Sequence, residues 1–437
     1  MPTKVIPSLR TLPVELLYRI LEYLDVQTIL LSLRKVCTKF YTITENFDRY
    51  KLDLSSSTKH DFHLICHLIH PESVMSIIVS DGEKTPGQIK LFFSLFQIQQ
   101  FIRLRSLTLN HIDCKDLNEI LHDILHCSLL SLSFHTRGKR NKSTLRLLSM
   151  FTTRSSLRQL SINTHAHHVA EIFSSIQSNL QHLNIGTCTY EEYHKILRHC
   201  PHLRTLIIDD CWMTDIGETN SIGSRGIFYP QLISLTFKDT NRSMIQLHLL
   251  LSFTPSLTYL KLINFPFAHN SLIDGYQWEI FIKRKLLLLK KFEFLFHQQL
   301  LRTYNSSSDI ESLLLPFRTS FWLEEKHWFV ICDYIKSCHQ TKFYSIPYCP
   351  ISFDYHLDPD HISLSTSMIK TYDPIILDNV HCLSLNLTEL KSKGMRKLVC
   401  SNNLIVQVEQ ASYHFEINRI GMCETGNEIG LRNFCRV

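Results

Sequence analysis

Apolar side chains recur at helical spacing over the first 50 positions. Pro13 suits the first turn of a helix, where a missing N–H costs nothing, and Glu15 places a negative charge at the positive end of the helix dipole. The apolar positions that follow at steps of three and four are Leu16, Leu17, Ile20, Leu21 and Leu24. This spacing predicts an amphipathic first helix.

Two more helices are predicted before residue 50, and Asp25 can cap the first of them. Their apolar positions are Ile29, Leu30 and Leu33 in the second helix and Val36, Phe40, Ile43 and Phe47 in the third. Three helices in so short a segment build only a small core, so we expect this module to gain stability by docking onto another surface.

A different pattern begins near residue 70, where a phrase with leucine, another aliphatic residue or Phe at positions 1, 4 and 6 starts to recur. The copies are Val74, Ile77, Val79; Leu104, Leu107, Leu109; Leu129, Leu132, Phe134; Leu157, Leu160, Ile162; Leu180, Leu183, Ile185; Leu203, Leu206, Ile208; Leu232, Leu235, Phe237; Leu257, Leu260, Leu262; and Leu289, Phe292, Phe294. This phrase indicates strands with one buried face.

Amphipathic helical segments separate many of these copies. The clearest cover 117–125, 169–176 and 244–251. A strand followed by a helix cannot bury its apolar side alone, so neighbouring units must stack. The sequence therefore predicts an α/β fold with parallel strands and outer helices. A doubly wound sheet is the alternative, but the 12 glycines form no phosphate-binding fingerprint after a strand.

The pattern fades after residue 300. A degenerate copy remains at Thr341, Tyr344, Ile346, and a better one at Val380, Leu383, Leu385. An aromatic-rich segment that we expect to be packed and helical contains Phe321, Trp322, Trp328, Phe329 and Tyr334. We expect two domains: a helical module over 6–50, and one irregular solenoid over 51–437 that is clearest in 70–300 and ends in degenerate repeats and a cap.

Composition narrows the possible partners. The formal net charge is only +6, which favours neither nucleic acid nor a membrane as a partner. The 14 cysteines form no Cys-x-x-Cys pair and suit reduced thiols in the cytoplasm, the nucleus or both. We find no apolar stretch of membrane-spanning length and no signal peptide, and nothing in the sequence calls for a cofactor.

The N-terminal module resembles the F-box, the motif that docks proteins onto the Skp-type adaptor of cullin–RING ubiquitin ligases. The match runs over about residues 8–50, with Phe40 where many F-boxes carry Trp. The residues that the resemblance implies for forming or supporting the adaptor-facing surface are Leu12, Pro13, Glu15, Leu16, Ile20, Leu24, Val36, Cys37 and Phe40. It also implies the Skp-type adaptor and the cullin scaffold as partners.

Residues 70–300 resemble leucine-rich-repeat proteins, because the copies start roughly 23 to 32 residues apart from 104 to 289. The resemblance implies a horseshoe whose inner strand face binds a target protein. Because the side chains of a strand alternate between its two faces, Leu107 and Leu109 point into the core and the residues between and after them point to the inner strand face. The candidate target contacts are Asn110, His135, Asn163, Asn184, Ile207, Asp209, Lys238, Tyr259 and Lys261. A merely solvated sheet face is the alternative.

Candidate chemical groups are few. Surface exposure is favoured over metal binding for two histidine groups, which are His165, His167, His168 and His60, His63, His67, His70. Asp209 and Asp210 are neighbours on a strand and point opposite ways, so they make a poor acid–base pair, and Glu191 and Glu192 form a second adjacent pair. No motif of a known catalytic class occurs.

These observations predict a non-catalytic, substrate-recognition subunit of a Skp–cullin–F-box-type ubiquitin ligase. The first alternative is a non-ligase scaffold that uses its solenoid only to bind protein. An enzyme or metal protein is a third class, which would require activity or stoichiometric metal in purified material.

Overall fold

The structure is a computed structural model of the chain. It describes residues 9–137, 142–154, 156–163, 169–173, 177–212, 228–238, 243–266, 270–299, 307–335, 340–347, 352–355, 361–366, 382–386, 405–410 and 413–417. The chain forms two compact units, Met1–Ile208 and Asp209–Val437, and each is described by itself.

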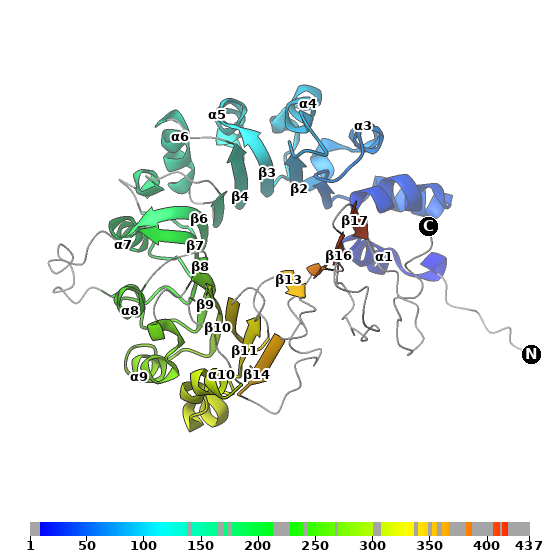
Figure 1. The fold of residues 1–437 in the computed structure, drawn as a ribbon. Helices are drawn as coiled ribbons and strands as arrows, with labels where there is room; N and C mark the ends of the chain where they lie inside the picture. The colour runs from blue at the N-terminus through cyan, green and yellow to red at the C-terminus, as the bar shows by residue number, and fades with distance from the viewer. Residues whose placement is uncertain are drawn as a thin grey trace, which may run out of the picture. The chain divides into compact units, whose positions relative to one another are not determined.

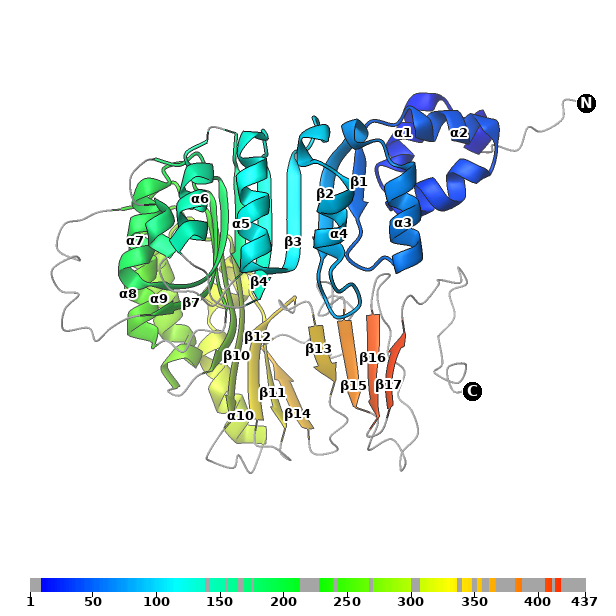
Figure 2. The same cartoon turned by 90° about the horizontal axis from the view of Figure 1, so that it is seen from above.

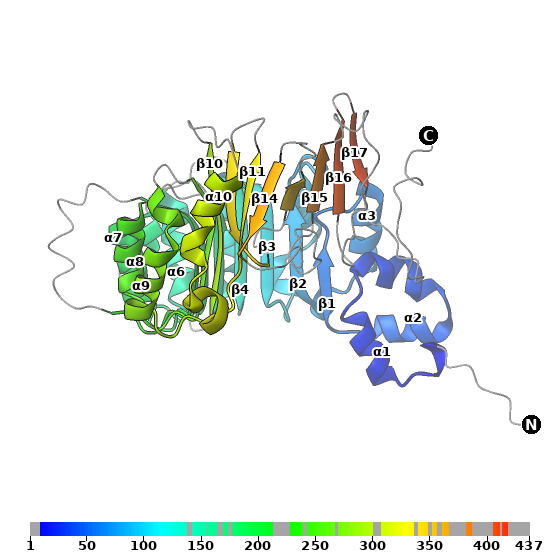
Figure 3. The ribbon, with the colours of Figure 1, turned by 60° about the horizontal axis from the view of Figure 1, so that its bottom comes forward.

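The first unit begins with the helical module, which Figure 3 places beside the start of the first strand. Its elements are η1 (Leu9–Thr11), α1 (Val14–Leu21), η2 (Thr28–Ser32), η3 (Leu33–Lys35) and α2 (Thr38–Glu45). Asp25 caps the second helical segment as expected, since its carboxylate accepts bonds from the Thr28 N–H at 2.7 Å and hydroxyl at 2.8 Å. That segment is a π-turn followed by a 3-10 turn, in place of the α-helix that the pattern predicted.

The first unit continues as an open sheet with its strands in chain order. The strands are β1 (Tyr50–Asp53), β2 (Val74–Ser80), β3 (Ser106–Asp113), β4 (Ser131–Arg137), β5 (Gln159–Asn163), β6 (His182–Thr189) and β7 (Thr205–Trp212), the last of which crosses the boundary between the units. Each pair from β1–β2 to β5–β6 is parallel. The prediction of a mixed α/β fold with parallel strands is confirmed.

Helices connect these strands and lie along one face of the sheet (Figure 1). They are α3 (Lys59–Leu68), η4 (Pro71–Ser73), α4 (Gln88–Leu95), η5 (Ile98–Gln100), α5 (Cys114–Asp123), η6 (Ile124–His126), α6 (Lys142–Thr152), η7 (Val169–Phe173) and α7 (Tyr190–His199). The predicted helical segments at 117–125 and 169–176 correspond to α5 with η6 and, over its described part, to η7.

The repeated apolar phrase forms the core of both units. Every residue in the nine copies is buried. One bond pattern also recurs where strands begin: the Leu130 carbonyl accepts the N–H groups of Arg158 and Gln159, and the Arg158 carbonyl accepts those of Gln181 and His182. The repeated apolar phrase in the sequence is therefore accompanied by a repeated pattern of backbone hydrogen bonds.

The second unit starts with the same strand–helix order and then departs from it. Its parallel strands are β8 (Ser234–Lys238), β9 (Tyr259–Pro266) and β10 (Lys291–Gln299), and its helices are α8 (Met244–Ser252), η10 (Asn270–Ile273), α9 (Gly275–Lys285), α10 (Ser307–Leu314), η11 (Leu315–Phe317) and η12 (Phe321–Glu325). The next strands, β11 (Val330–Ile335), β12 (Gln340–Ser345) and β14 (His361–Ser365), pair antiparallel in the order β10-β12-β11-β14.

The two weak copies beyond residue 300 lie in different surroundings. Thr341 and Tyr344 lie on the antiparallel strand β12, whereas Leu383 and Leu385 lie on β15 in a separate four-stranded sheet. That sheet has the order β13 (Ser352–Tyr355), β15 (Cys382–Asn386), β16 (Ile405–Gln410), β17 (Tyr413–Ile417), as Figure 2 shows. The predicted aromatic helix is only partly correct, because Tyr334 belongs to strand β11.

Candidate functional site

The helical module carries large apolar side chains that are exposed. Its large exposed apolar residues are Leu9, Val14, Leu16, Tyr23, Val36 and Tyr41. The opposite side of α1 is packed, since Leu17 and Leu21 are 3% and 2% exposed while Leu16 is 45% exposed. Six exposed apolar side chains on so small a module indicate a candidate protein-binding surface.

The residues implied by the F-box resemblance divide by exposure. Pro13, Glu15, Leu16 and Val36 are exposed, and Leu12, Ile20, Leu24 and Cys37 are half-buried. Phe40 is 4% exposed, so it can support the surface only from within the core.

Lys39 connects α2 to the segment that precedes α1. Its ammonium donates to the carbonyl of Arg10 at 2.7 Å and to that of Leu12 at 3.0 Å. The first turn of α2 therefore lies alongside the segment that leads into α1. Sequence reasoning missed Lys39, because a single lysine on a helix gives no periodic signal.

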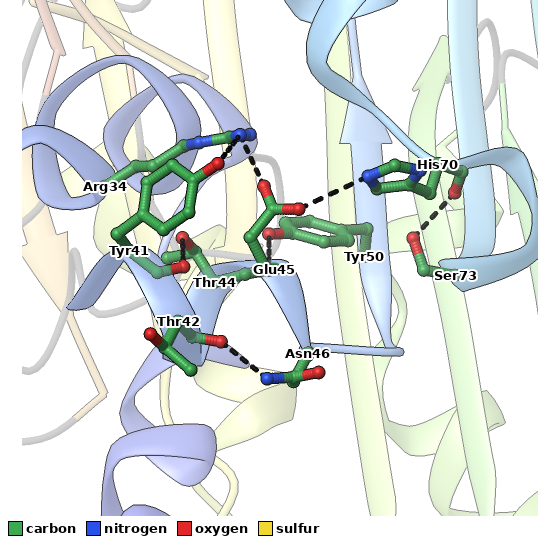
Figure 4. A network of polar contacts seen from close by, with 9 residues as sticks. All are labelled: Arg34, Tyr41, Thr42, Thr44, Glu45, Asn46, Tyr50, His70 and Ser73. Carbon is green, nitrogen blue, oxygen red and sulfur yellow. Dashed lines mark hydrogen bonds and ion pairs between the residues drawn. The ribbon is translucent and has the colours of Figure 1, made fainter. Parts of the chain in front are cut away.

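A polar network joins the module to the sheet of the first unit (Figure 4). Glu45, at the end of α2, pairs with Arg34 of η3 and lies 3.5 Å from the imidazole Nε2 of His70. The Arg34 guanidinium also lies 4.8 Å from the centre of the Tyr41 ring. The buried Tyr50 hydroxyl of β1 donates to the carbonyl of Thr44 at 2.7 Å.

Two further contacts strengthen this attachment. Gln27 donates to the Ser57 hydroxyl at 2.9 Å, and Asp48 pairs with Arg103. The hydrogen bond from Arg103 is the main cause that lowers the pKa of Asp48, although burial opposes it. Gln27 lies just before η2 and Asp48 just after α2, so contacts from both ends of the module attach it to the rest of the first unit.

The sheet face opposite the helices carries the other predicted site residues. Asn110, His135, Asn184 and Ile207 are half-buried and Asn163 is exposed, and each alternates with buried positions of its strand. Strand register aligns small polar side chains in a row across the first unit, namely Thr108, Ser133, Ser161 and Asn184. Asn184 donates to Ser161 at 3.1 Å within that row.

The same face of the second unit is charged and aromatic. Lys238 pairs with Asp209 at 3.1 Å, so two of the predicted contacts bind each other. The Tyr259 hydroxyl donates to Glu293 at 2.6 Å, and Lys261 lies 3.5 Å from the same oxygen. Burial acts to raise the pKa of Glu293, but bonds from Lys291 and Tyr259 and the charges of both lysines outweigh it, so the pKa is lowered.

Candidate catalytic or metal-binding groups are not brought together in the described ranges. His60, His63, His67 and His70 are all exposed, and no group of three or more His, Cys, Asp or Glu there could hold a metal ion. His165, His167 and His168 lie outside the described residues.

The second acidic pair divides between two roles. Glu192 closes a capping box at the start of α7, where it accepts the Thr189 N–H at 2.8 Å, while Glu191 is exposed. A capping carboxylate stabilises the helix, which accounts for one of the two acidic residues without any chemistry.

A comparison with protein families supports the module's identity. The F-box-like family model matches residues 9–50, which supports an F-box protein and suggests a role as an F-box adaptor that binds a Skp-type protein. F-box domains are typically non-catalytic. No curated protein matches the chain at a significant level. None of the helices in the described part of the chain is long and apolar enough to cross a membrane.

Proposed function

We propose that this protein is the substrate-recognition subunit of a Skp–cullin–F-box-type ubiquitin ligase. The observation that carries the proposal is the apolar surface of residues 9–41, which coincides with the F-box-like match. The residues that would contact the adaptor are Leu12, Pro13, Leu16, Ile20 and Val36, with Phe40 supporting them from the core. The cullin scaffold would join through the adaptor.

The proposal extends to the rest of the chain as an irregular, leucine-rich-repeat-like solenoid whose open strand face holds a target protein. The buried phrase and the recurring paired bonds between successive strands support it. Tyr259 and Ile207 would be the stronger contacts, since aromatic and apolar side chains dominate interface energy. The reduced thiols fit a cytoplasmic or nuclear protein.

In this proposal the subunit performs no bond chemistry. It raises the effective concentration of a target lysine near the ubiquitin-carrying enzyme. The contacts of Glu45, Asp48 and Gln27 would contribute by fixing the module against the first-unit sheet.

The test is binding of a purified Skp-type adaptor to the full chain, measured by titration calorimetry. Leu16→Ala with Ile20→Ala should weaken binding by about 10-fold or more, since truncating a central interface residue costs over 1 kcal/mol. Leu95→Ala is the matched control, because Leu95 is 49% exposed but lies outside the module.

A wild-type chain that fails to bind the adaptor would contradict the proposal and favour the scaffold alternative. Equal losses for the double variant and for Leu95→Ala would also contradict it, because the effect would then not belong to the module.

A further inference from the structure

The turn between α9 and β10 has an unusual composition. The Leu289 N–H closes it by donating to the Leu286 carbonyl at 3.0 Å, so Leu287 and Leu288 are its two central residues. They are 71% and 55% exposed, whereas Leu286 and Leu289 are buried. The outer leucines therefore anchor the turn while the central pair faces solvent.

The repeat provides an internal comparison for this turn. The corresponding turns before β7, β8 and β9 are closed by the same type of bond from Leu203, Leu232 and Leu257. Their central pairs are Pro201-His202, Pro230-Gln231 and Pro255-Ser256. Proline and small polar residues are the usual turn formers. The turn before β3 is closed in the same way by the Leu104 N–H across Ile102 and Arg103, and Ile102 is 75% exposed. Among these five turns, two adjacent exposed leucines occur at 287–288 alone, and turn formation does not require them.

Cations flank the leucine pair on both sides. Arg284 and Lys285 end α9, and Lys290 follows the turn; all three are exposed. Lys283 and Lys291 are paired with Glu279, Glu325 and Glu293, whereas the described residues offer no ion pair to Arg284, Lys285 or Lys290. Cations at a helix end also complement its dipole, but Lys290 lies beyond the helix.

We propose that this turn, residues 284–290, docks onto an anionic lipid surface, with Leu287 and Leu288 entering the acyl boundary and the three cations meeting the headgroups. Each half matches a known requirement of interfacial binding: apolar insertion, and attraction of basic residues to anionic lipid. A two-residue tip buries far less than the roughly 800 Å² per partner of a specific protein interface, which favours lipid over protein. The elements that present the turn, α9 and β10, appear in Figure 3.

This proposal revises the expectation drawn from net charge, because a charge of +6 spread over the chain hides a local cluster. It is independent of the proposed ligase role, since no residue of the turn belongs to 9–50. The predicted contact is weak and reversible, because two leucine side chains bury far fewer CH₂ groups than the lipid chain that stable anchoring combines with a polybasic patch.

The test is co-sedimentation of the full chain with vesicles of phosphatidylcholine alone or mixed with phosphatidylserine. Leu287→Pro with Leu288→Ser copies the turn of the preceding repeat and should keep the fold. It should weaken binding to the anionic vesicles at least 10-fold, since each inserted CH₂ contributes about 4-fold. Replacing Arg284, Lys285 and Lys290 with Gln should cost about 5-fold for each.

Ile245→Ser is the matched control, because Ile245 on α8 is 70% exposed but has no part in the turn, and it should bind vesicles as the wild type does. Leu288→Trp should show a blue-shifted emission on anionic vesicles. Adaptor binding by the same variants should stay unchanged, which separates the two proposals.

The inference would be overturned if the wild-type chain did not bind anionic vesicles, or if it bound both vesicle types equally. It would also be overturned if the turn variants bound as tightly as the wild type. A dimer that the Leu287→Pro, Leu288→Ser variant dissociates would also overturn it, by assigning the leucines to a second copy.

Discussion

The strands of both units are built from the same apolar phrase. The units differ in the side chains on the sheet face that lies away from the helices. In the first unit that face carries small polar side chains such as Thr108, Ser133 and Ser161. In the second unit it carries Tyr259, Lys261 and the buried Glu293. A shared core pattern therefore leaves the functional face free to diverge, because alternate strand positions are independent of the buried ones.

The units also differ in how long the parallel order lasts. Every strand of the first unit is followed by a helix or a long connection, which a parallel crossover requires. In the second unit only four residues separate Ile335 from Gln340, too few for such a crossover, so β11 and β12 pair antiparallel. The short connection therefore accounts for the antiparallel pairing of β11 with β12.

The largest expected losses of unfolding free energy come from replacing a large buried side chain with Ala in one unit at a time. Trp322→Ala removes an indole ring whose centre lies 4.8 Å from that of the Phe317 ring and whose N–H donates to the Gly275 carbonyl at 3.2 Å. It should cost about 3–5 kcal/mol, and Leu107→Ala in the first unit about 2–5 kcal/mol.

Hydrogen exchange followed by peptide analysis would locate the loss, which we expect in the second unit for Trp322→Ala and in the first for Leu107→Ala. Equal loss in both units from either change would show that the two cores unfold as one.

The next largest difference in stability is expected between substitutions on the sheet face of the second unit and on that of the first. Glu293→Gln removes a buried carboxylate that accepts the Tyr259 hydroxyl and lies beside Lys261 and Lys291, and should cost about 1–3 kcal/mol in denaturant unfolding. Ser133→Ala on the face of the first unit is the control and should change stability by about 0.5 kcal/mol or less. Comparable losses at both positions would remove the distinction between the faces.

Among the described residues, each unit holds a histidine whose burial lowers its pKa from the usual 6.5 to about 4: His194 on α7 in the first unit and His248 on α8 in the second. The unfolded chain then binds more protons than the folded one between these values, so stability should fall as the pH drops from 6.5 towards 4.

Thermal unfolding at pH 6.5 and 5, where most carboxyls stay ionised, would measure this loss. His194→Gln and His248→Gln should each flatten the pH dependence relative to the wild type. Variants whose melting temperatures fall in parallel with the wild type would contradict the assignment.

The smallest effect is expected at the attachment of the helical module. Glu45→Gln weakens the pairs with Arg34 and His70 and should cost about 1 kcal/mol or less, because both pairs are partly exposed. Exchange of the Tyr50 and Leu52 amides in β1 should nevertheless quicken, since the module then holds less firmly. Unchanged exchange there would mean that the contacts of Gln27, Asp48 and Tyr50 hold the module without Glu45.

Much of the fold could be predicted because buried positions repeat. The phrase located β2 to β10 and their core residues, and the helical steps located α1 and α2. Strand β1 was missed, since Tyr50 and Leu52 form no full copy of the phrase. The antiparallel strands were missed because strand direction depends on connections that apolar periodicity does not report.

The candidate site was less predictable than the core. Periodicity placed Leu16 and Leu17 on one apolar face of α1 and could not separate the exposed Leu16 from the buried Leu17. It could not show that Lys39 fixes the entry to α1, that Arg34 and His70 meet at Glu45, or that Lys238 and Asp209 neutralise each other. Charged contacts join residues far apart in sequence and leave no regular spacing.

The central claim is that the helical module, and not the sheet faces, docks the Skp-type adaptor. Hydrogen exchange of the full chain with and without a saturating adaptor tests it most directly. The account predicts new protection within residues 9–41 and none across β2 to β10. Protection on those strands with an unchanged module, or no protection anywhere, would contradict it.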